Sequence, residues 1–225
     1  MRKIVCALIA LMLMAPAAAL ASDLEITQEA FYVTPFLTYY AGEIFCEVTN
    51  TSDRIMRITD GQYELYGEGG ANLNSGTIYS IYPRTLGPGE KAYFSVTSSV
   101  KDAAKADDIK SYSVSVVGKP IEEKEPEYEV SDVRMEEKTG WINGTRLTAV
   151  VTNNSEEPVP QLYLTFAVFD SDGALLYVGA ASSMGLALLP GNSGQMGTDF
   201  DRDIMNALHE QDIEPASVVA IATGW

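Results

Sequence analysis

The chain has 225 residues, a formal net charge of −16 and a single histidine. A surface this acidic repels nucleic acid and anionic membranes, so we do not expect a nucleic-acid partner. The two cysteines, Cys6 and Cys46, are too few for a disulfide framework.

Residues 1–21 have the pattern of a secretory signal peptide. Arg2 and Lys3 form a short positive start, and the stretch from Ile4 to Leu20 is almost wholly apolar. Ala19-Leu20-Ala21 then supplies the small-x-small cleavage pattern. We therefore expect an exported protein that is secreted or associated with the cell envelope.

An uncleaved membrane anchor is the alternative for this segment, because about 18 apolar residues can just span a bilayer. Pro16 and the small alanines before Ser22 favour cleavage. Cleavage removes Cys6, lowers the net charge to −18 and leaves Cys46 as the lone thiol. No transmembrane anchor is then expected.

The remaining sequence contains an internal repeat, which indicates two homologous domains. Val48-Thr49-Asn50-Thr51-Ser52-Asp53 recurs as Val151-Thr152-Asn153-Asn154-Ser155-Glu156, a shift of 103 positions. The shift continues through further features: Tyr63–Tyr66 falls on Phe166–Phe169, residues 67–70 fall on 170–173, and Pro88-Gly89 meets Pro190-Gly191 one residue out of step.

The domain boundary is expected in residues 120–126. Two prolines bracket a charged, apolar-poor stretch there, which is typical of a semi-extended linker. The first domain then covers residues 22–119 and the second covers residues 127–225.

Within each repeat the hydrophobic period is two, which predicts strands. Ile44, Cys46 and Val48 alternate with Phe45 and Glu47, as expected of a half-buried strand. Short strands separated by turn residues favour an antiparallel sandwich.

Each copy also has a short stretch with helical spacing before its last strand. In the second copy, residues 201–209 place Ile204 and Leu208 on one helical face, with acidic residues in the first turn. The matching stretch of the first copy is residues 100–106. The predicted fold is all-β: two tandem immunoglobulin-like antiparallel β-sandwich domains, each with a short helix before its last strand.

Tyr63-Glu64-Leu65-Tyr66-Gly67 and Phe166-Ala167-Val168-Phe169-Asp170 resemble the namesake motif of the FxLYD domain family. The first copy has Gly67 where the family has Asp, and the second has Val168 where the family has Leu. The resemblance implies small immunoglobulin-like sandwiches in exported or envelope-associated prokaryotic proteins, with no established enzymatic activity.

Aromatic side chains supply the best candidate for a binding patch. Tyr39 and Tyr40, together with Tyr79 and Tyr82, lie near the ends of expected strands in the first repeat. Exposed tyrosines could stack on sugar rings or anchor a protein partner, whereas core packing is the alternative for some of them.

We expect no catalytic residues. Gly191-Asn192-Ser193-Gly194 resembles the nucleophile segment of trypsin-like proteases, but the single histidine, His209, lies downstream, whereas that family places it far upstream. Cys46 occupies the position of Ala149 in the other repeat, so a buried, unreactive thiol is the favoured interpretation.

No metal or other cofactor is expected either. Asp170-Ser171-Asp172-Gly173 resembles the opening of a calcium loop but lacks the distal glutamate of an EF-hand. A calcium site completed by Asp199, Asp201 or Asp203 stays open, and a hairpin turn is the favoured alternative.

These observations favour a non-catalytic secreted protein, an extracellular or envelope-associated binding or spacer module. Its partner would be a cell-envelope component or an extracellular protein. The alternative is a hydrolase that uses two carboxylates in a cleft between the domains.

Overall fold

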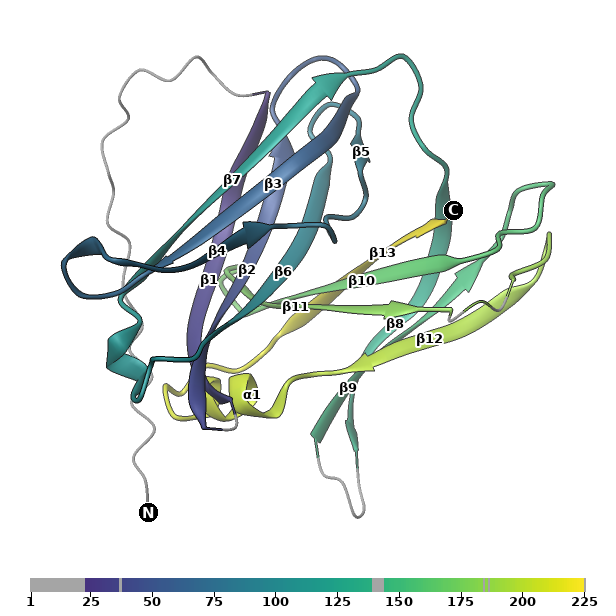
Figure 1. Ribbon diagram of the computed structural model, residues 1–225. Helices are drawn as coiled ribbons and strands as arrows, with labels where there is room; N and C mark the ends of the chain where they lie inside the picture. Colours follow the sequence, from purple (N-terminus) through teal and green to yellow (C-terminus); the bar gives the residue numbers. More distant parts are fainter. Residues whose placement is uncertain (1–22, 37, 139–143, 184, 186, 225) are drawn as a thin grey trace. The chain divides into compact units, whose positions relative to one another are not determined.

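The computed structural model describes residues 23–36, 38–138, 144–183, 185 and 187–224 (Figure 1). The expected signal peptide lies outside these residues. The chain divides into two compact units, Met1–Glu123 and Lys124–Trp225, and each is treated by itself. No helix in the described part of the chain is long and apolar enough to cross a membrane.

Unit 1 is an antiparallel β-sandwich. Its first sheet has the order β1-β2-β6, and in its second sheet β3 pairs with β4, β5 and β7 (Figure 1). The elements are β1 (Leu24–Phe36), β2 (Tyr39–Asn50), β3 (Met56–Tyr66), the 3₁₀ turn η1 (Glu68–Gly70), β4 (Asn72–Thr77), β5 (Thr85–Leu86), β6 (Lys91–Val100), the 3₁₀ turn η2 (Ala106–Asp108) and β7 (Ser111–Pro120).

Alternating apolar residues of both sheets fill the space between them. Ile44, Cys46 and Val48 of β2 meet Met56 and Leu65 of β3 in one buried cluster. Because side chains alternate between faces along a strand, this pattern sends one set of residues to the core and the other set outward. The predicted all-β, immunoglobulin-like sandwich fold is confirmed.

Unit 2 builds the same kind of fold from one continuous strand order, β11-β10-β13-β8-β9-β12. The start of β8 pairs with β13 at Tyr128 and Ala222, and β8 then pairs with β9 from Glu129 onward. The elements are β8 (Glu127–Lys138), β9 (Gly144–Thr152), β10 (Leu162–Phe169), β11 (Leu175–Ser182), β12 (Ser193–Asp199), the helix α1 (Arg202–His209) and β13 (Ser217–Gly224).

The two units repeat one strand arrangement. The order β1-β2-β6 corresponds to β8-β9-β12, and β4-β3-β7 corresponds to β11-β10-β13. The hairpin turn after β3 also recurs after β10: Gly67 N donates to Ala71 O at 2.8 Å, and Asp170 N donates to Ala174 O at 3.1 Å.

A buried asparagine makes the same hydrogen bonds in both units. Asn50 Nδ2 donates to Arg54 O at 2.7 Å and to Leu86 O at 2.9 Å. In unit 2, Asn153 Nδ2 donates to Glu157 O at 2.9 Å and to Leu188 O at 2.8 Å. Both asparagines are 0 % exposed.

The backbone around each asparagine repeats as well. Gly89 N donates to Asn50 O, and Gly191 N donates to Asn153 O, both at 2.8 Å. Both glycines have positive φ, 76° and 72°, a conformation that glycine adopts without a steric penalty. The Asn-x-Ser and Pro-Gly signals of the repeat are therefore the two sides of one hydrogen-bonded junction.

The helix expected in the first copy is not an α-helix. β6 continues to Val100, and only the 3₁₀ turn η2 forms before β7. The connection between these strands has ten residues, 101–110, against 17 residues, 200–216, in unit 2. The shorter connection also lacks the apolar pair Ile204 and Leu208, which unit 2 buries.

The strand over residues 44–48 is buried on both faces, so the half-buried interpretation is wrong here. Phe45 is 3 % exposed and its ring lies 6.0 Å from that of Tyr32. Glu47 is 1 % exposed because neighbouring polar side chains bind its carboxylate.

The asparagine junction should carry a large share of each unit's stability. We expect Asn50→Ala and Asn153→Ala each to lower the free energy of unfolding by about 3 kcal/mol. Each substitution removes the side-chain donor that two backbone carbonyls share at a buried site. Urea unfolding measures the change. The exposed Asn72→Ala is the control, and an equal, small effect of all three substitutions would contradict this role.

Candidate functional site

The outer face of the β4-β3-β7 sheet in unit 1 carries a row of polar side chains. Gln62 and Glu64 lie on β3 and point away from the core, as do Asp60 and Tyr66 at the ends of the row. The flanking residues on this face are Ser75 and Thr77 of β4 and Ser111, Ser113, Ser115 and Val117 of β7. We call this surface the polar face.

Short side chains on both sides leave room above the central strand. Glu64 pairs with Ser75 on one side and with Ser113 on the other. Gln62 is flanked in the same way by Thr77 and Ser115. The result is an open hollow of about 380 Å³, lined by Gln62, Tyr63, Glu64, Ser75, Gly76, Ser113 and Ser115.

A β-bulge in β3 lies directly before the first residue of the row, Asp60. The pairing of β3 with β7 skips Thr59 between Ile58 and Asp60, and Thr59 Oγ1 donates to Val117 O at 3.1 Å. A bulge of this kind bends the strand and re-aims the side chain that follows. Asp60 is thereby placed on the exposed face of β3.

Hydrogen bonds within the row hold it in one arrangement. Gln62 Nε2 donates to Asp60 Oδ1 at 3.1 Å and to Thr77 Oγ1 at 3.3 Å. Gly61 N donates to Asp60 Oδ1 at 2.9 Å, and the hydroxyl of Tyr66 donates to Glu64. The acceptor atoms of the face are thus fixed by the protein itself.

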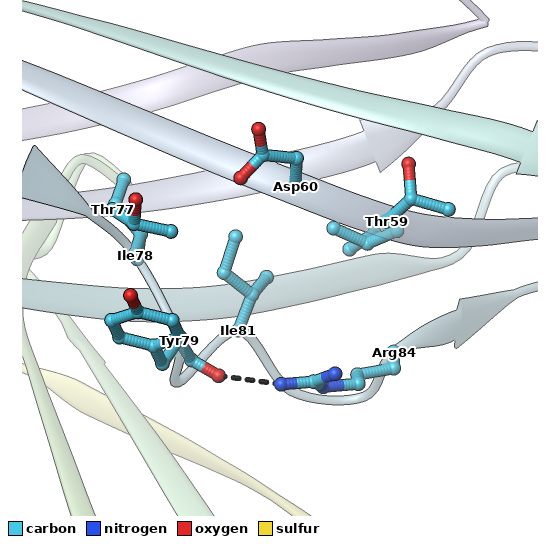
Figure 2. Close-up of a pocket in the computed structure, with 8 residues that line it drawn as sticks. Thr59, Asp60, Thr77, Ile78, Tyr79, Ile81 and Arg84 are labelled. Carbon is cyan, nitrogen blue, oxygen red and sulfur yellow. Dashed lines mark hydrogen bonds between the residues drawn. The ribbon is translucent and has the colours of Figure 1, made fainter.

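A second hollow is lined in part by Asp60 and Thr77 of the polar face (Figure 2). It has a volume of about 140 Å³ and lies between β3 and the segment that leads from β4 to β5. Its lining residues are Ile58, Thr59, Asp60, Thr77, Ile78, Tyr79, Ile81 and Arg84. We call it the Tyr79 hollow.

Tyr79 is the most exposed large hydrophobic side chain of the described residues, at 73 %. Arg84 holds the backbone beside it, donating from Nη2 to Tyr79 O at 2.8 Å (Figure 2). The same guanidinium lies 6.0 Å from the ring centre of Tyr82. The segment is therefore braced while the ring of Tyr79 stays available.

The four tyrosines selected from the sequence do not gather in one patch. Tyr82 bridges to Tyr93, which pairs with Glu47, whereas Tyr40 pairs with Val100. Tyr40 and Glu47 are seven positions apart on β2, which corresponds to about 23 Å of strand. Only Tyr79 lines a hollow.

The other three have partners within unit 1. Tyr39 packs its ring 5.4 Å from that of Phe36, and Tyr40 packs against the core. Tyr82 N and O both bond to the backbone of Tyr93.

The polar residues of β3 were missed by the sequence analysis, although a signal was present. The repeat aligns Gln62 with Thr165 and Glu64 with Ala167, and both unit 2 residues are buried. Glu64 is polar where unit 2 has the apolar Ala167, which indicates that the two outer faces differ. That comparison could have identified the polar face.

Glu47 is the one charged side chain that is buried among the described residues. Lys91 Nζ lies 2.9 Å from its Oε1, and Thr27 Oγ1 donates to the same oxygen at 2.8 Å. Tyr93 donates its hydroxyl to Oε2 at 3.3 Å. Burying a carboxylate requires such partners, so this cluster is explained by folding alone.

Cys46 is fully buried in the unit 1 core. Burial raises the pKa of its thiol, and the negative charge of Glu29 raises it further. The thiolate is the reactive form of cysteine, so both effects suppress reaction at neutral pH.

The candidate calcium-loop aspartates serve other purposes in the structure. Asp170 Oδ1 accepts from Asp172 N at 2.9 Å and from Ala174 N at 2.8 Å, which closes the hairpin turn. Asp201 caps α1, and Asp199 lies 2.5 Å from Lys138 Nζ. No group of three or more His, Cys, Asp or Glu side chains in the described ranges is placed to hold a metal ion.

The remaining candidates are placed at the surface of unit 2. His209 ends α1, with Nε2 3.6 Å from a carboxylate oxygen of Glu214. Ser193 begins β12, and its hydroxyl lies 2.8 Å from that of Thr152.

No protein-family model and no curated protein sequence matches the chain. The similarity of the chain to solved structures is low, as two examples show. Red sea bream transglutaminase is 15 % identical with a TM-score of 0.22, over 79 % of this chain and 27 % of the transglutaminase chain. The CBM22-1-CBM22-2 tandem domain of Paenibacillus barcinonensis Xyn10C is 9 % identical with a TM-score of 0.22, over 90 % and 86 % of the two chains.

The chain thus spans about a quarter of the length of the transglutaminase. TM-scores of 0.22 do not bear on function.

Cys46 should be unreactive in the folded protein. We expect a thiol reagent at pH 7 to label less than one tenth of the molecules in the time that labels all of them in urea, because the thiol is buried and protonated. Mass spectrometry of the intact protein counts the label. Rapid labelling without denaturant would show that the site opens.

Alkaline pH should destabilise unit 1. Burial raises the pKa of Tyr93 and of Tyr112, with further contributions from the charges of Glu47 and Glu29 respectively. The unfolded chain loses these protons first, so stability is full below pH about 10 and falls as the pH rises above it. We expect Tyr93→Phe to reduce this fall, measured as the urea midpoint at pH 9 and pH 11. The exposed Tyr79→Phe is the control and should leave the fall unchanged.

Proposed function

We propose that the protein is an exported, non-catalytic binding module that attaches to a component of the cell envelope through the polar face and the adjoining Tyr79 hollow. The observation that carries the proposal is the 73 % exposure of Tyr79 in a hollow that Asp60 and Thr77 of the polar face also line. An aromatic ring left in water costs free energy that a bound partner recovers.

The arrangement of the face supports a binding role. Its acceptors are fixed by hydrogen bonds within the protein, so little conformational freedom is lost when a ligand docks. The contrast with unit 2 supports it as well, because the shared fold does not require Gln62 and Glu64 at these positions.

The spacing of the carboxylates argues against the hydrolase alternative on this face. Asp60 and Glu64 are four residues apart on β3, about 13 Å of strand. Glycosidases hold their two carboxyl groups about 5 to 9.5 Å apart. Glu47, the buried carboxylate, is bonded to Lys91, Thr27 and Tyr93.

Co-sedimentation with the envelope fraction of the source organism tests the proposal. We expect residues 22–225 to pellet saturably, with Tyr79→Ala weakening the apparent affinity by roughly tenfold because an aromatic contact is lost. Adding calcium or a chelator should change nothing.

Tyr39→Ala is the matched control, since Tyr39 lies in the same unit but lines neither hollow. Protein that stays in the supernatant would overturn the proposal. Equal weakening by the two substitutions would place the binding site elsewhere.

A further inference from the structure

We propose that the polar face binds a neutral oligosaccharide, with sugar hydroxyls bonded to Asp60, Gln62 and Glu64 and one ring stacked on Tyr79. This inference rests on the proposed function and names its ligand class.

The first argument is the match of hydrogen-bonding groups. A sugar presents neighbouring hydroxyls, each of which both donates and accepts. Carboxylates accept strongly from such donors, and serine hydroxyls can rotate to serve either role. The polar face offers both kinds of group side by side, with Glu64 between Ser75 and Ser113.

The second argument is the composition of the face. Serine, aspartate and glutamate are depleted where proteins bury one another, and protein interfaces depend on apolar pockets that take an aromatic or arginine anchor. The hollow over Gln62 and Glu64 is lined mainly by polar side chains. A polyhydroxylated ligand therefore suits it better than a protein surface does.

The third argument is the position of the exposed ring of Tyr79. Tyr79 lines the hollow that adjoins the polar row at Asp60 and Thr77. From Glu64 to Asp60 the row extends for about 13 Å, more than one sugar ring covers. The ligand is therefore a chain of sugars, with one unit over Tyr79 and others along β3.

Charge then selects among sugar chains. The face presents Asp60 and Glu64, and the whole chain carries a net charge of −16. Uronic acids, sulfated sugars and phosphate-linked glycans are repelled by this field. A neutral chain meets no such penalty.

Selective treatment of the envelope fraction tests the ligand class. Periodate cleaves the vicinal diols of sugars, whereas a proteinase removes exposed protein. We expect periodate to abolish pelleting of residues 22–225 and proteinase to leave it intact. Loss with proteinase and survival with periodate would overturn the carbohydrate ligand while the proposed function stands. Failure to pellet with untreated envelope would overturn the proposed function itself.

Calorimetry with defined sugars then tests the face. The probes are cellohexaose, xylohexaose and mannohexaose, whose units carry vicinal diols, with polygalacturonate as the anionic comparison. We expect the sugars that bind to be neutral, and Glu64→Gln to weaken binding by roughly tenfold through loss of a charge-assisted hydrogen bond.

Glu68→Gln is the matched control, because Glu68 is an exposed glutamate of η1 that lines neither hollow. Polygalacturonate binding as tightly as the neutral chains would overturn the selection by charge. An equal effect of the two glutamine substitutions would overturn the assignment to the polar face.

Discussion

The sandwich of each unit depends on one buried asparagine. Asn50 ends β2 in the first sheet. Its side-chain amide donates to Leu86 O of β5 in the second sheet and to Arg54 O in the turn between β2 and β3. A buried carbonyl without a donor is costly, so this amide fixes where the chain crosses from one sheet to the other. Because Asn153 repeats the same bonds, two copies that differ at most positions keep the same strand order.

With the crossing fixed, the outer surfaces are free to differ between the copies. The residues that face the core are equivalent in the two units, as Leu65 and Val168 show, and both are fully buried. One residue earlier, the polar Glu64 of unit 1 is replaced by the buried Ala167 of unit 2. A strand exposes alternate side chains, so this change alters the outer face without touching the core.

Much of the fold could be predicted from the sequence because it rests on local, repeated signals. Alternation and turn residues gave the strands and hairpins, and the repeat gave the equivalence of Asn50 and Asn153. Burial on the outer face of β2 could not be predicted from local sequence. The carboxylate of Glu47 is buried because it binds Lys91 and Tyr93, which lie more than 40 positions away in the chain. The polar face depends on the pairing of β3 with β4 and β7, and this strand pairing cannot be predicted from the order of residues along the chain. Tyr40 and Tyr82 were both selected from the sequence, but their separation follows from the strand register.

The difference between the copies also determines valency. Duplicated binding domains often gain strength by engaging two sites on one polymer, where the second contact forms at a high effective concentration. Here the row at Asp60, Gln62 and Glu64 has no exposed counterpart at Thr165 and Ala167, which are both buried. A molecule that binds through this row makes a single contact, so its residence time on a surface is set by one dissociation step. On the proposed oligosaccharide ligand, binding through this one row would allow exchange between neighbouring chains without cross-linking them.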